Sequence, residues 1–274
     1  MYIKKDEEIK KIIEGGKIIG SILEELSKMV KPGISALEID IQAEKLIIKA
    51  GGKPAFKGYK SHPKDLPFPT TICASLNEEI VHGIATKQKI LKEGDIFSID
   101  IGMEWPVGKI QDTNNKKQKG YFTDTAVTVI VGNVPEKVKQ LLNVTKNALE
   151  IGIEQCQAGN NISDIGKAIE NYVKPFGYGI VRDLVGHGVG HAVHEEPRVP
   201  NFYDKEVESW RLEPGVVIAI EPMITLGGHE IKTAEDGWSI STADNSLSAH
   251  FEHTVIITEN GPIVATRRPS EINN

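Results

Sequence analysis

Residues 91–102 read LKEGDIFSIDIG, and residues 212–223 read LEPGVVIAIEPM. The two stretches carry leucine, glycine, isoleucine and a late carboxylate in corresponding places, so that Asp100 corresponds to Glu221. In both, a glycine is followed by alternating or continuous apolar residues, which is typical of a β-strand. Because two unrelated β-hairpins can also match by chance, the flanking elements must decide whether the chain contains a repeat.

Two helical patterns precede each of these stretches. Apolar residues recur at helical spacing over about 6–30, and a capping-box pattern that begins at Ser35 predicts a second helix over about 36–50. The second half repeats this order, with helices predicted over about 135–156 and 163–177. The repeated order favours duplication over chance.

Strand-like segments follow both helix pairs. TTICASL (70–76), DIFSIDIGM (95–103) and YFTDTAVTVIVG (121–132) are rich in β-branched residues and alternate in polarity. We therefore predict one α/β domain over residues 1–274, built from two like halves at about 6–132 and 135–260. If the halves face one another, corresponding strands are expected side by side, with the site for chemistry between the halves.

Composition excludes several classes of protein. The chain has 274 residues, 39% of them hydrophobic, which is enough for a large core. A net charge of −6 argues against broad nucleic-acid binding, and the lysine-rich segment 109–119 is interpreted as a solvated loop. No run approaches the roughly 20 apolar residues of a membrane span, and the N-terminus does not resemble a secretory signal. Cys73 and Cys156 provide no disulfide framework, so we expect a cytoplasmic protein.

Four acidic residues occur in strand-like segments, where a charge is unexpected. Asp100 lies opposite the apolar face of DIFSIDIGM, and Asp124 interrupts YFTDTAVTVIVG. Glu221 interrupts VVIAIEPMI, and Glu252 precedes a β-branched run in AHFEHTVIIT. Any one of them alone is read as a partly exposed or salt-bridged acid. If all four converge, they raise one another's pKa unless cations lie among them.

The segment GHGVGHAVHEEP (186–197) supplies a candidate imidazole ligand. His187 and His191 have the spacing of a helical zinc pair, but each glycine inside a helix costs about 1 kcal/mol relative to alanine. The segment is therefore predicted to be extended or looped, and other ligands must come from elsewhere. Four carboxylates and His187 suffice for two divalent metals about 3.5–4 Å apart. Such a set suits manganese, iron(II) or cobalt as well as zinc.

These five residues, in the contexts SIDIG, FTDT, GHGVGH, AIEPM and FEHT, resemble the metal-ligand signature of type I methionine aminopeptidases. The resemblance covers nearly the whole chain. It implies the pita-bread fold, in which two pseudo-symmetric halves of helices pack on a curved, mainly antiparallel sheet. It also implies that Asp124 and Glu252 bridge two metals. Asp100 would chelate one metal, and His187 with Glu221 would complete the other.

The same resemblance implies roles in substrate binding and catalysis. A metal-activated water would attack the first peptide bond, with Glu221 as proton shuttle. His194 would stabilise the developing oxyanion, and His82 would assist proton transfer to the leaving amine. Each aromatic residue of the implied methionine pocket is, taken alone, equally consistent with core packing. The residues implied to line that pocket are Tyr59, Phe68, Cys73 and Trp238.

Several positions depart from the family pattern or lie beside it. Val193 stands where the family commonly has an aromatic residue, and about 60–68 and 104–120 are predicted to be surface insertions. His191 is predicted to bind neither metal nor substrate, and to be either a donor that hydrogen-bonds a ligand residue or a residue at the rim of the site. The two histidines near Glu252 are predicted to point away from the metals; they are His250 and His253.

The resemblance implies a methionyl aminopeptidase that removes the initiator methionine from nascent proteins when the second residue is small. It would act as a monomer, with a transient ribosome contact and without a membrane or a specific nucleic acid. Two alternatives stay open. An Xaa-Pro peptidase shares the fold and ligands but usually has an extra N-terminal domain, for which a first helix near Asp6 leaves no room. A binding protein that has lost catalysis would lack metal ligands, whereas all five positions are filled.

Overall fold

The computed structural model describes residues 2–60, 62–107 and 120–272. In the first half, the predicted long helices are present as α1 (Asp6–Met29) and α2 (Ala36–Lys49). Ser35 caps α2 as predicted, since its hydroxyl accepts a hydrogen bond from the Glu38 N–H at 3.3 Å. The strands of this half are β1 (Lys53–Pro54), β2 (Ile72–Leu76), β3 (Glu79–Val81), β4 (Ile96–Trp105) and β5 (Tyr121–Ile130).

The second half also begins with two helices. The helix predicted from Ser163 begins one residue earlier, because Asn161 is the N-cap and the Asp164 carboxylate accepts its N–H at 2.8 Å. The helical elements are α3 (Glu136–Glu154), α4 (Ile162–Val173), η1 (Lys174–Phe176), η2 (Lys205–Val207) and α5 (Pro269–Ile272). The strands are β6 (Gly179–Ile180), β7 (Gly186–Gly188), β8 (Glu195–Val199), β9 (Val217–Ile220), β10 (Met223–Thr225), β11 (Ile231–Thr233), β12 (Ile240–Thr242), β13 (Ser248–His250), β14 (Glu252–Ile256) and β15 (Ile263–Val264).

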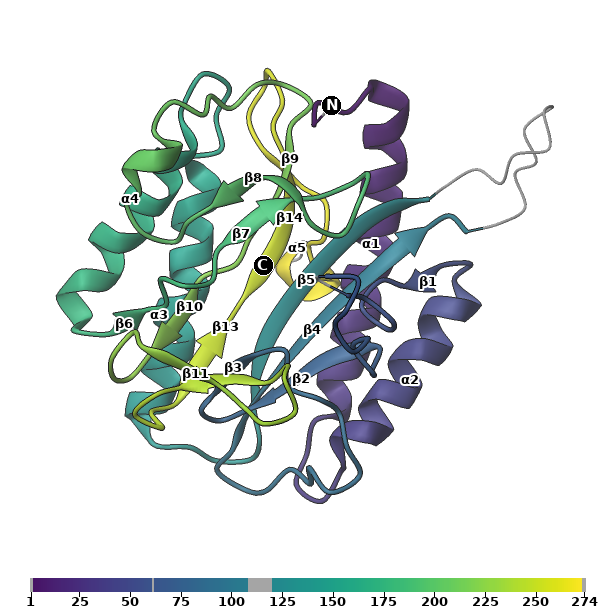
Figure 1. Cartoon of the computed structure of the whole chain (residues 1–274), viewed down its shortest axis with the longest axis vertical. Coiled ribbons are helices and arrows are strands. Elements are labelled where there is room, and N and C mark those ends of the chain that lie inside the picture. The colour runs from purple at the N-terminus through teal and green to yellow at the C-terminus, as the bar shows by residue number, and fades with distance from the viewer. Residues whose placement is uncertain (1, 61, 108–119, 273–274) are drawn as a thin grey trace.

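The main sheet runs across both halves in the order β1-β4-β5-β14-β9-β7-β8, and each of these neighbouring pairs is antiparallel. The expectation that corresponding strands lie side by side is wrong for β4 and β9, because β5 and β14 pair between them. In Figure 1, α1 and α2 lie on the side of β4 and β5, and α3 and α4 lie on the opposite side of the molecule. The central pair β5–β14 thus joins the two halves.

Alternation along β4 separates the core from the site. Phe97, Ile99 and Ile101 are fully buried in a cluster with α1 and α2. Asp100, between them in sequence, therefore points to the opposite face of the sheet. A second cluster holds α3 and α4 against β9 and β14. Both helix pairs leave the Asp100 face of the central strands free for a cavity.

The insertion predicted at 104–120 leaves the strand register intact. β4 extends two residues into the predicted range and stays paired with β5 out to Trp105 opposite Tyr121, so the strands keep their alignment and any inserted residues follow Trp105. The whole lysine-rich segment 109–119 lies outside the described residues. Among the residues that the structure describes, no helix combines the length and apolar character needed to cross a membrane.

Candidate metal centre and substrate cavity

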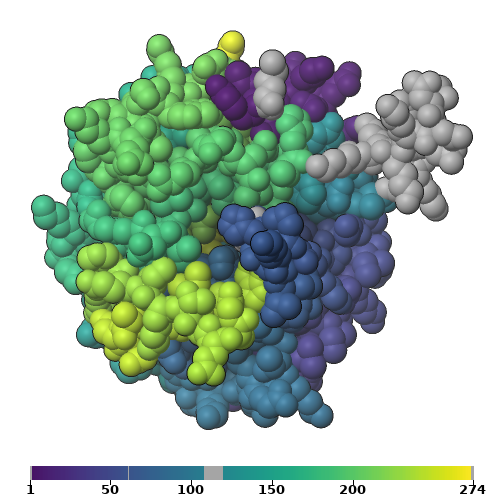
Figure 2. Space-filling model, viewed as in Figure 1, coloured from purple at the N-terminus to yellow at the C-terminus, as the bar shows by residue number. Residues whose placement is uncertain are grey.

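One cavity of about 290 Å³ collects the predicted functional residues. Figure 2 shows a hollow near the middle of one face, where blue, green and yellow-green segments from distant parts of the chain meet. All eleven residues predicted for the metal and substrate sites line this cavity. They come from both halves of the chain, so neither half forms the site alone.

Strand register explains how three of the acids converge. Asp100 on β4 and Glu252 on β14 are both paired with Ala126, one on each side of β5. Because paired residues in neighbouring strands point to the same face, both carboxylates extend over the small alanine side chain. Asp124 lies two residues from Ala126 on that same face, and its Oδ1 is 3.3 Å from the Thr254 hydroxyl. The acids of both halves therefore meet above the central strand.

His187 joins this group from β7. One ligand atom each from Asp124, His187 and Glu252 lie within 4.8 Å of one another. The Nδ1 of His187 donates to the Gly188 carbonyl oxygen at 2.9 Å, which places the ring proton on Nδ1. Nε2 faces the acids, 3.5 Å from Asp124 Oδ2 and 3.6 Å from Glu221 Oε1. With Nδ1 as the donor to the backbone, Nε2 is the ring atom that can bind a metal.

The glycines around His187 allow close backbone approach. A Cβ on Gly186 would lie 2.3 Å from the Ala219 carbonyl oxygen, and one on Gly188 would lie 2.1 Å from that of Glu196. Both distances are too short for any side chain. The segment is extended and looped, as predicted, because β7 must fit closely between β8 and β9.

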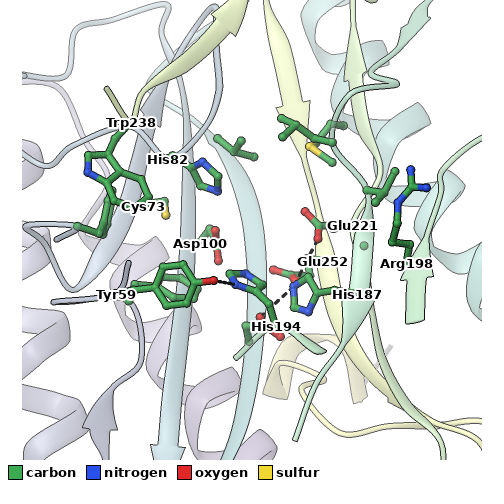
Figure 3. A pocket seen from close by; sticks show the side chains of 18 residues that line it. Tyr59, Cys73, His82, Asp100, His187, His194, Arg198, Glu221, Trp238 and Glu252 are labelled. Carbon is green, nitrogen blue, oxygen red and sulfur yellow. Dashed lines mark hydrogen bonds and ion pairs between the residues drawn. The ribbon is translucent and has the colours of Figure 1, made fainter. Parts of the chain in front are cut away.

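Glu221 follows the end of β9 and lies next to His187 in the cavity (Figure 3). Its backbone carbonyl accepts a hydrogen bond from the Asn201 side chain at 3.0 Å. The prediction that His250 points away from the acids is wrong, since its Nε2 lies 3.6 Å from Glu221 Oε2. His250 ends β13 and Glu252 begins β14 two residues later, and the extended chain between them leaves both side chains on the side of the acids. His253 does point away, with Nδ1 at 3.0 Å from the Thr266 hydroxyl.

The electrostatics of the acids fit a cation site. Burial raises the pKa of Asp100, Glu221 and Glu252 well above ordinary values, and repulsion among the acids raises them further. Burial also raises the pKa of Asp124, although His187 and Thr254 oppose this shift. The Oδ1 atom of Asp100 is buried and has no hydrogen-bond partner among the residues that the structure describes. Buried oxygen donors with unsatisfied capacity match the coordination preference of divalent metal ions.

The substrate side of the cavity is aromatic and contains two histidines. The Tyr59 hydroxyl lies 2.8 Å from His194 Nδ1, and the His194 ring packs edge-on against His187 with centroids 4.4 Å apart. Burial lowers the pKa of His82 to about 4. Burial and the neighbouring imidazoles also lower the pKa of His194, although its edge is open to the cavity. Both rings are thus neutral near pH 7.

The predicted methionine pocket is a compact group next to these histidines (Figure 3). The rings of Phe68 and Trp238 meet edge-on at 5.3 Å, and Trp238 lies 6.3 Å from the His82 ring. Cys73 is buried against Phe68, and its thiol contacts the Asp100 carboxylate. Val193, where the family commonly has an aromatic residue, is buried in the same cluster. The pocket is therefore formed without an aromatic ring at that position.

His82 adopts a strained backbone conformation. Its φ angle is 58°, a region that non-glycine residues rarely occupy. The following residue, Gly83, approaches the backbone of β2 so closely that a Cβ would lie 2.5 Å from the Ala74 carbonyl oxygen. The turn after β3 therefore directs the His82 ring into the cavity, and strain of this kind gathers at functional sites.

The structure adds cavity residues that sequence reasoning missed. Phe56 lies three residues before Tyr59, and this aromatic spacing in AFKGY was a usable signal. The others carry no clear signal of their own in the sequence, because they reach the cavity only through the tertiary arrangement of strands and loops. They are Val81, Leu184, Val185, Gly186, Arg198 and Met223. His191 does not line the cavity, in agreement with its predicted place outside the metal set.

Comparison with known proteins identifies the family. Residues 10–259 match the profile of metallopeptidase family M24. The chain belongs to this family. It is 45% identical over 264 residues to a methionine aminopeptidase of Borreliella burgdorferi, covering 96% of this chain and 97% of the relative. It is 43% identical over 254 residues to methionine aminopeptidase 1 of Bacillus subtilis, covering 93% and 94%. The resemblance inferred from the sequence is confirmed.

Solved structures support the predicted fold class. A methionine aminopeptidase from Thermotoga maritima superposes with a TM-score of 0.86 at 37% identity, covering 97% of this chain and 99% of that chain. A prolidase from Pyrococcus horikoshii gives a TM-score of 0.73 at 24% identity, and only 64% of that chain is covered. The prolidase match shows the shared fold alone. The M24 family and the acid cluster together indicate that the protein uses divalent metal.

Proposed function

We propose that this protein removes the N-terminal methionine from polypeptides whose second residue is small, by metal-dependent hydrolysis of the first peptide bond. One observation carries the proposal: buried metal-type ligands and an aromatic, sulfur-containing pocket open into the same small cavity. A cavity of this size admits one side chain and its flanking peptide bond. The names and near full-length matches of the relatives support the same activity.

We propose that the cavity acids and His187 hold two divalent ions, from among manganese, iron(II), cobalt and zinc. Asp124 and Glu252 would contact both ions, Asp100 would bind one, and His187 with Glu221 would bind the other. Four buried acids need more positive charge than one imidazole provides, which supports two cations over one. When bound, such ions lower the pKa of a coordinated water and polarise the substrate carbonyl.

The protein's own side chains perform the remaining steps. The Tyr59 hydroxyl holds His194 at Nδ1, so that Nε2 is left to contact the carbonyl oxygen of the scissile bond. Neutral His82 would contact the leaving amine and assist proton transfer to it. Glu221 would move the proton from the attacking water. Phe68, Cys73 and Trp238 would enclose the methionine thioether and exclude water.

The cavity and the proposed substrate also support a proposal for the domain organisation and the cellular setting. We propose a single catalytic domain over 1–274, with pseudo-repeat halves at about 6–132 and 135–260, because both halves supply cavity residues. A site completed within one chain is consistent with a monomer. Substrates that begin with methionine are nascent chains, so we propose a cytoplasmic enzyme with a transient ribosome contact.

Metal-dependent cleavage of Met-Ala-Ser tests the proposal. Protein stripped with chelator is expected to be inactive, and added manganese or cobalt is expected to restore turnover. Asp100→Ala should remove nearly all activity. The control is Asp6→Ala, which changes an exposed aspartate in the first turn of α1 and should leave activity intact. Preferential cleavage of Ala-Pro peptides would favour an Xaa-Pro peptidase. Complete inactivity with every metal would favour a binding protein.

A further inference from the structure

The chain that precedes α1 is bound to the segment that leads into β9 of the main sheet. Ile3 forms an antiparallel bridge with Val216, and the Lys4 N–H donates to the Gly215 carbonyl oxygen at 2.8 Å. These contacts hold the arm, defined as residues 2–5, against the start of β9. Because β9 leads directly to Glu221, the arm lies on an element of the catalytic cavity.

The Lys4 side chain runs from this arm beneath the loop that carries His194. The side chain is only 1% exposed, and its Nζ donates to Glu195 Oε1 at 2.7 Å. The same Nζ donates to the Tyr2 carbonyl oxygen at 3.0 Å. The same Glu195 oxygen accepts the His191 N–H at 2.9 Å. One carboxylate thus joins the arm to both ends of the segment 191–195.

Gly190 shows that the loop is shaped around this lysine. Its φ angle is 129°, a conformation that L side chains rarely adopt. A Cβ on Gly190 would lie 2.7 Å from Lys4 Cε, so the lysine stem occupies the space that a side chain would need. The glycine therefore meets both a backbone and a packing requirement.

Two further contacts hold the same loop. His191 Nε2 lies 3.0 Å from Glu8 Oε1, and the Tyr121 hydroxyl donates to that oxygen at 3.3 Å. The Phe122 N–H donates to the Gly190 carbonyl oxygen at 2.8 Å. These partners lie on α1 and β5. Among the described contacts, Lys4 alone forms a buried ion pair with Glu195, the residue directly after His194.

We propose that Lys4 is a positioning residue for catalysis, which acts through Glu195 to fix the loop that presents His194 to the scissile carbonyl. The inference rests on the proposed function, because His194 acts there on the reacting atoms. Without the Lys4 ammonium, the carboxylate of Glu195 would lose its buried cation and turn toward solvent. The backbone of His194 would then shift, and a displacement of about 1 Å can lower the rate by about 100-fold.

Lys4→Met tests this inference, because methionine keeps the buried apolar stem and removes the charge. Its kcat for Met-Ala-Ser is expected to fall by about 10- to 100-fold, with small changes in KM and bound metal. Lys4→Arg, which keeps the charge, should recover part of the loss. Lys5→Met is the matched control, since Lys5 is the neighbouring lysine and is exposed. It should behave as the unmodified protein.

A double-mutant cycle separates positioning from general destabilisation. In a His194→Ala background, Lys4→Met should cause no further loss of kcat, because the residue on which it acts is gone. An equal loss in both backgrounds, or the same kcat for Lys4→Met and Lys5→Met, would overturn the inference. If Lys4→Met does not fold, Glu195→Gln in the same cycle provides the test.

A readout that needs no turnover distinguishes this inference from the proposed function. In protein with ¹⁵N-labelled histidine, the His194 ring signals should shift in Lys4→Met and stay in place in Lys5→Met. Inactive unmodified protein would overturn the proposed function. Unchanged His194 signals in Lys4→Met would overturn the positioning role, whatever the activity.

Discussion

Removing the metal should destabilise the protein more at high pH than at low pH. In the metal-free cavity, burial and mutual repulsion raise the pKa of Asp100, Glu221 and Glu252. Between the unfolded pKa and the raised folded pKa, the folded metal-free protein binds protons that the unfolded chain has released. Its stability therefore falls as pH rises through that range. Bound metal displaces these protons, so the loaded protein does not show this loss.

The magnitude follows from proton linkage. Each carboxyl that stays protonated in the metal-free protein from pH 5.5 to pH 7.5 adds about 2.7 kcal/mol to the metal-dependent stabilisation over that interval. In a domain of this size, each 1 kcal/mol shifts Tm by about 2–4 °C. The gap in Tm between loaded and stripped protein should thus widen by about 5–11 °C for each such carboxyl.

Buried histidines titrate in part of the same range, and the comparison removes their effect. Burial lowers the pKa of His82 to about 4 and that of His250 to about 3. Each therefore destabilises the fold as pH falls below about 6.5, where the unfolded imidazole gains a proton. Neither is in the proposed ligand set, so this loss occurs in loaded and stripped protein alike.

Scanning calorimetry measures the effect directly. Protein is melted at pH 5.5 and 7.5, with chelator or with manganese buffered at one free concentration. Asp100→Asn serves as a comparison, because it removes one of the acids. In this variant, the difference in Tm between loaded and stripped protein should increase less from pH 5.5 to pH 7.5. A gap in Tm that is equal at the two pH values, or larger at pH 5.5, would refute the reasoning that uncompensated acids line the cavity.

Three further substitutions test the site and the fold. Tyr59→Phe removes the hydroxyl that lies 2.8 Å from His194. Because a hydrogen bond contributes about 0.5–1.5 kcal/mol, steady-state kinetics should show kcat/KM for Met-Ala-Ser lowered by about 2- to 10-fold. Trp238→Ala should raise KM by about 10-fold or more with a smaller change in kcat, because the methionine side chain loses an apolar contact surface. An unchanged KM would show that Trp238 does not contact the methionine side chain. Gly166→Ala places a Cβ 2.1 Å from the Phe202 carbonyl oxygen. Chemical denaturation should show the free energy of unfolding lowered by about 1–3 kcal/mol. The control Lys167→Ala, at an exposed position of the same helix, should change it by less than about 0.5 kcal/mol.

Local patterns predicted the elements of this fold well. The capping box at Ser35 marks the start of α2, and the alternation around Asp100 identifies the face of β4 that leaves the core. Both features depend on residues within a few positions of one another. The start of α4 differed by one residue because Asn161 and Asp164 form the cap there. Helix ends depend on small differences between neighbouring caps, so an error of this size is expected.

Sequence reasoning failed where sheet order decided the outcome. Nothing local indicates that β5 and β14 separate β4 from β9, because the pairing partner of a strand depends on the whole topology. The error for His250 has a simpler cause. It is two residues from Glu252, and strand alternation applied consistently would have placed both on one face.

The sequence by itself determined which segments form helices and strands, and it marked the acids and the histidine that carry metal-type chemistry. These properties follow from local periodicity and from the free-energy cost of burying charge. Only the tertiary structure decided that Asp100 and Glu252 meet above Ala126, and that Lys4 lies beneath the loop of His194. Contacts between residues so distant in the chain depend on sheet register and on packing between elements, which no local pattern encodes.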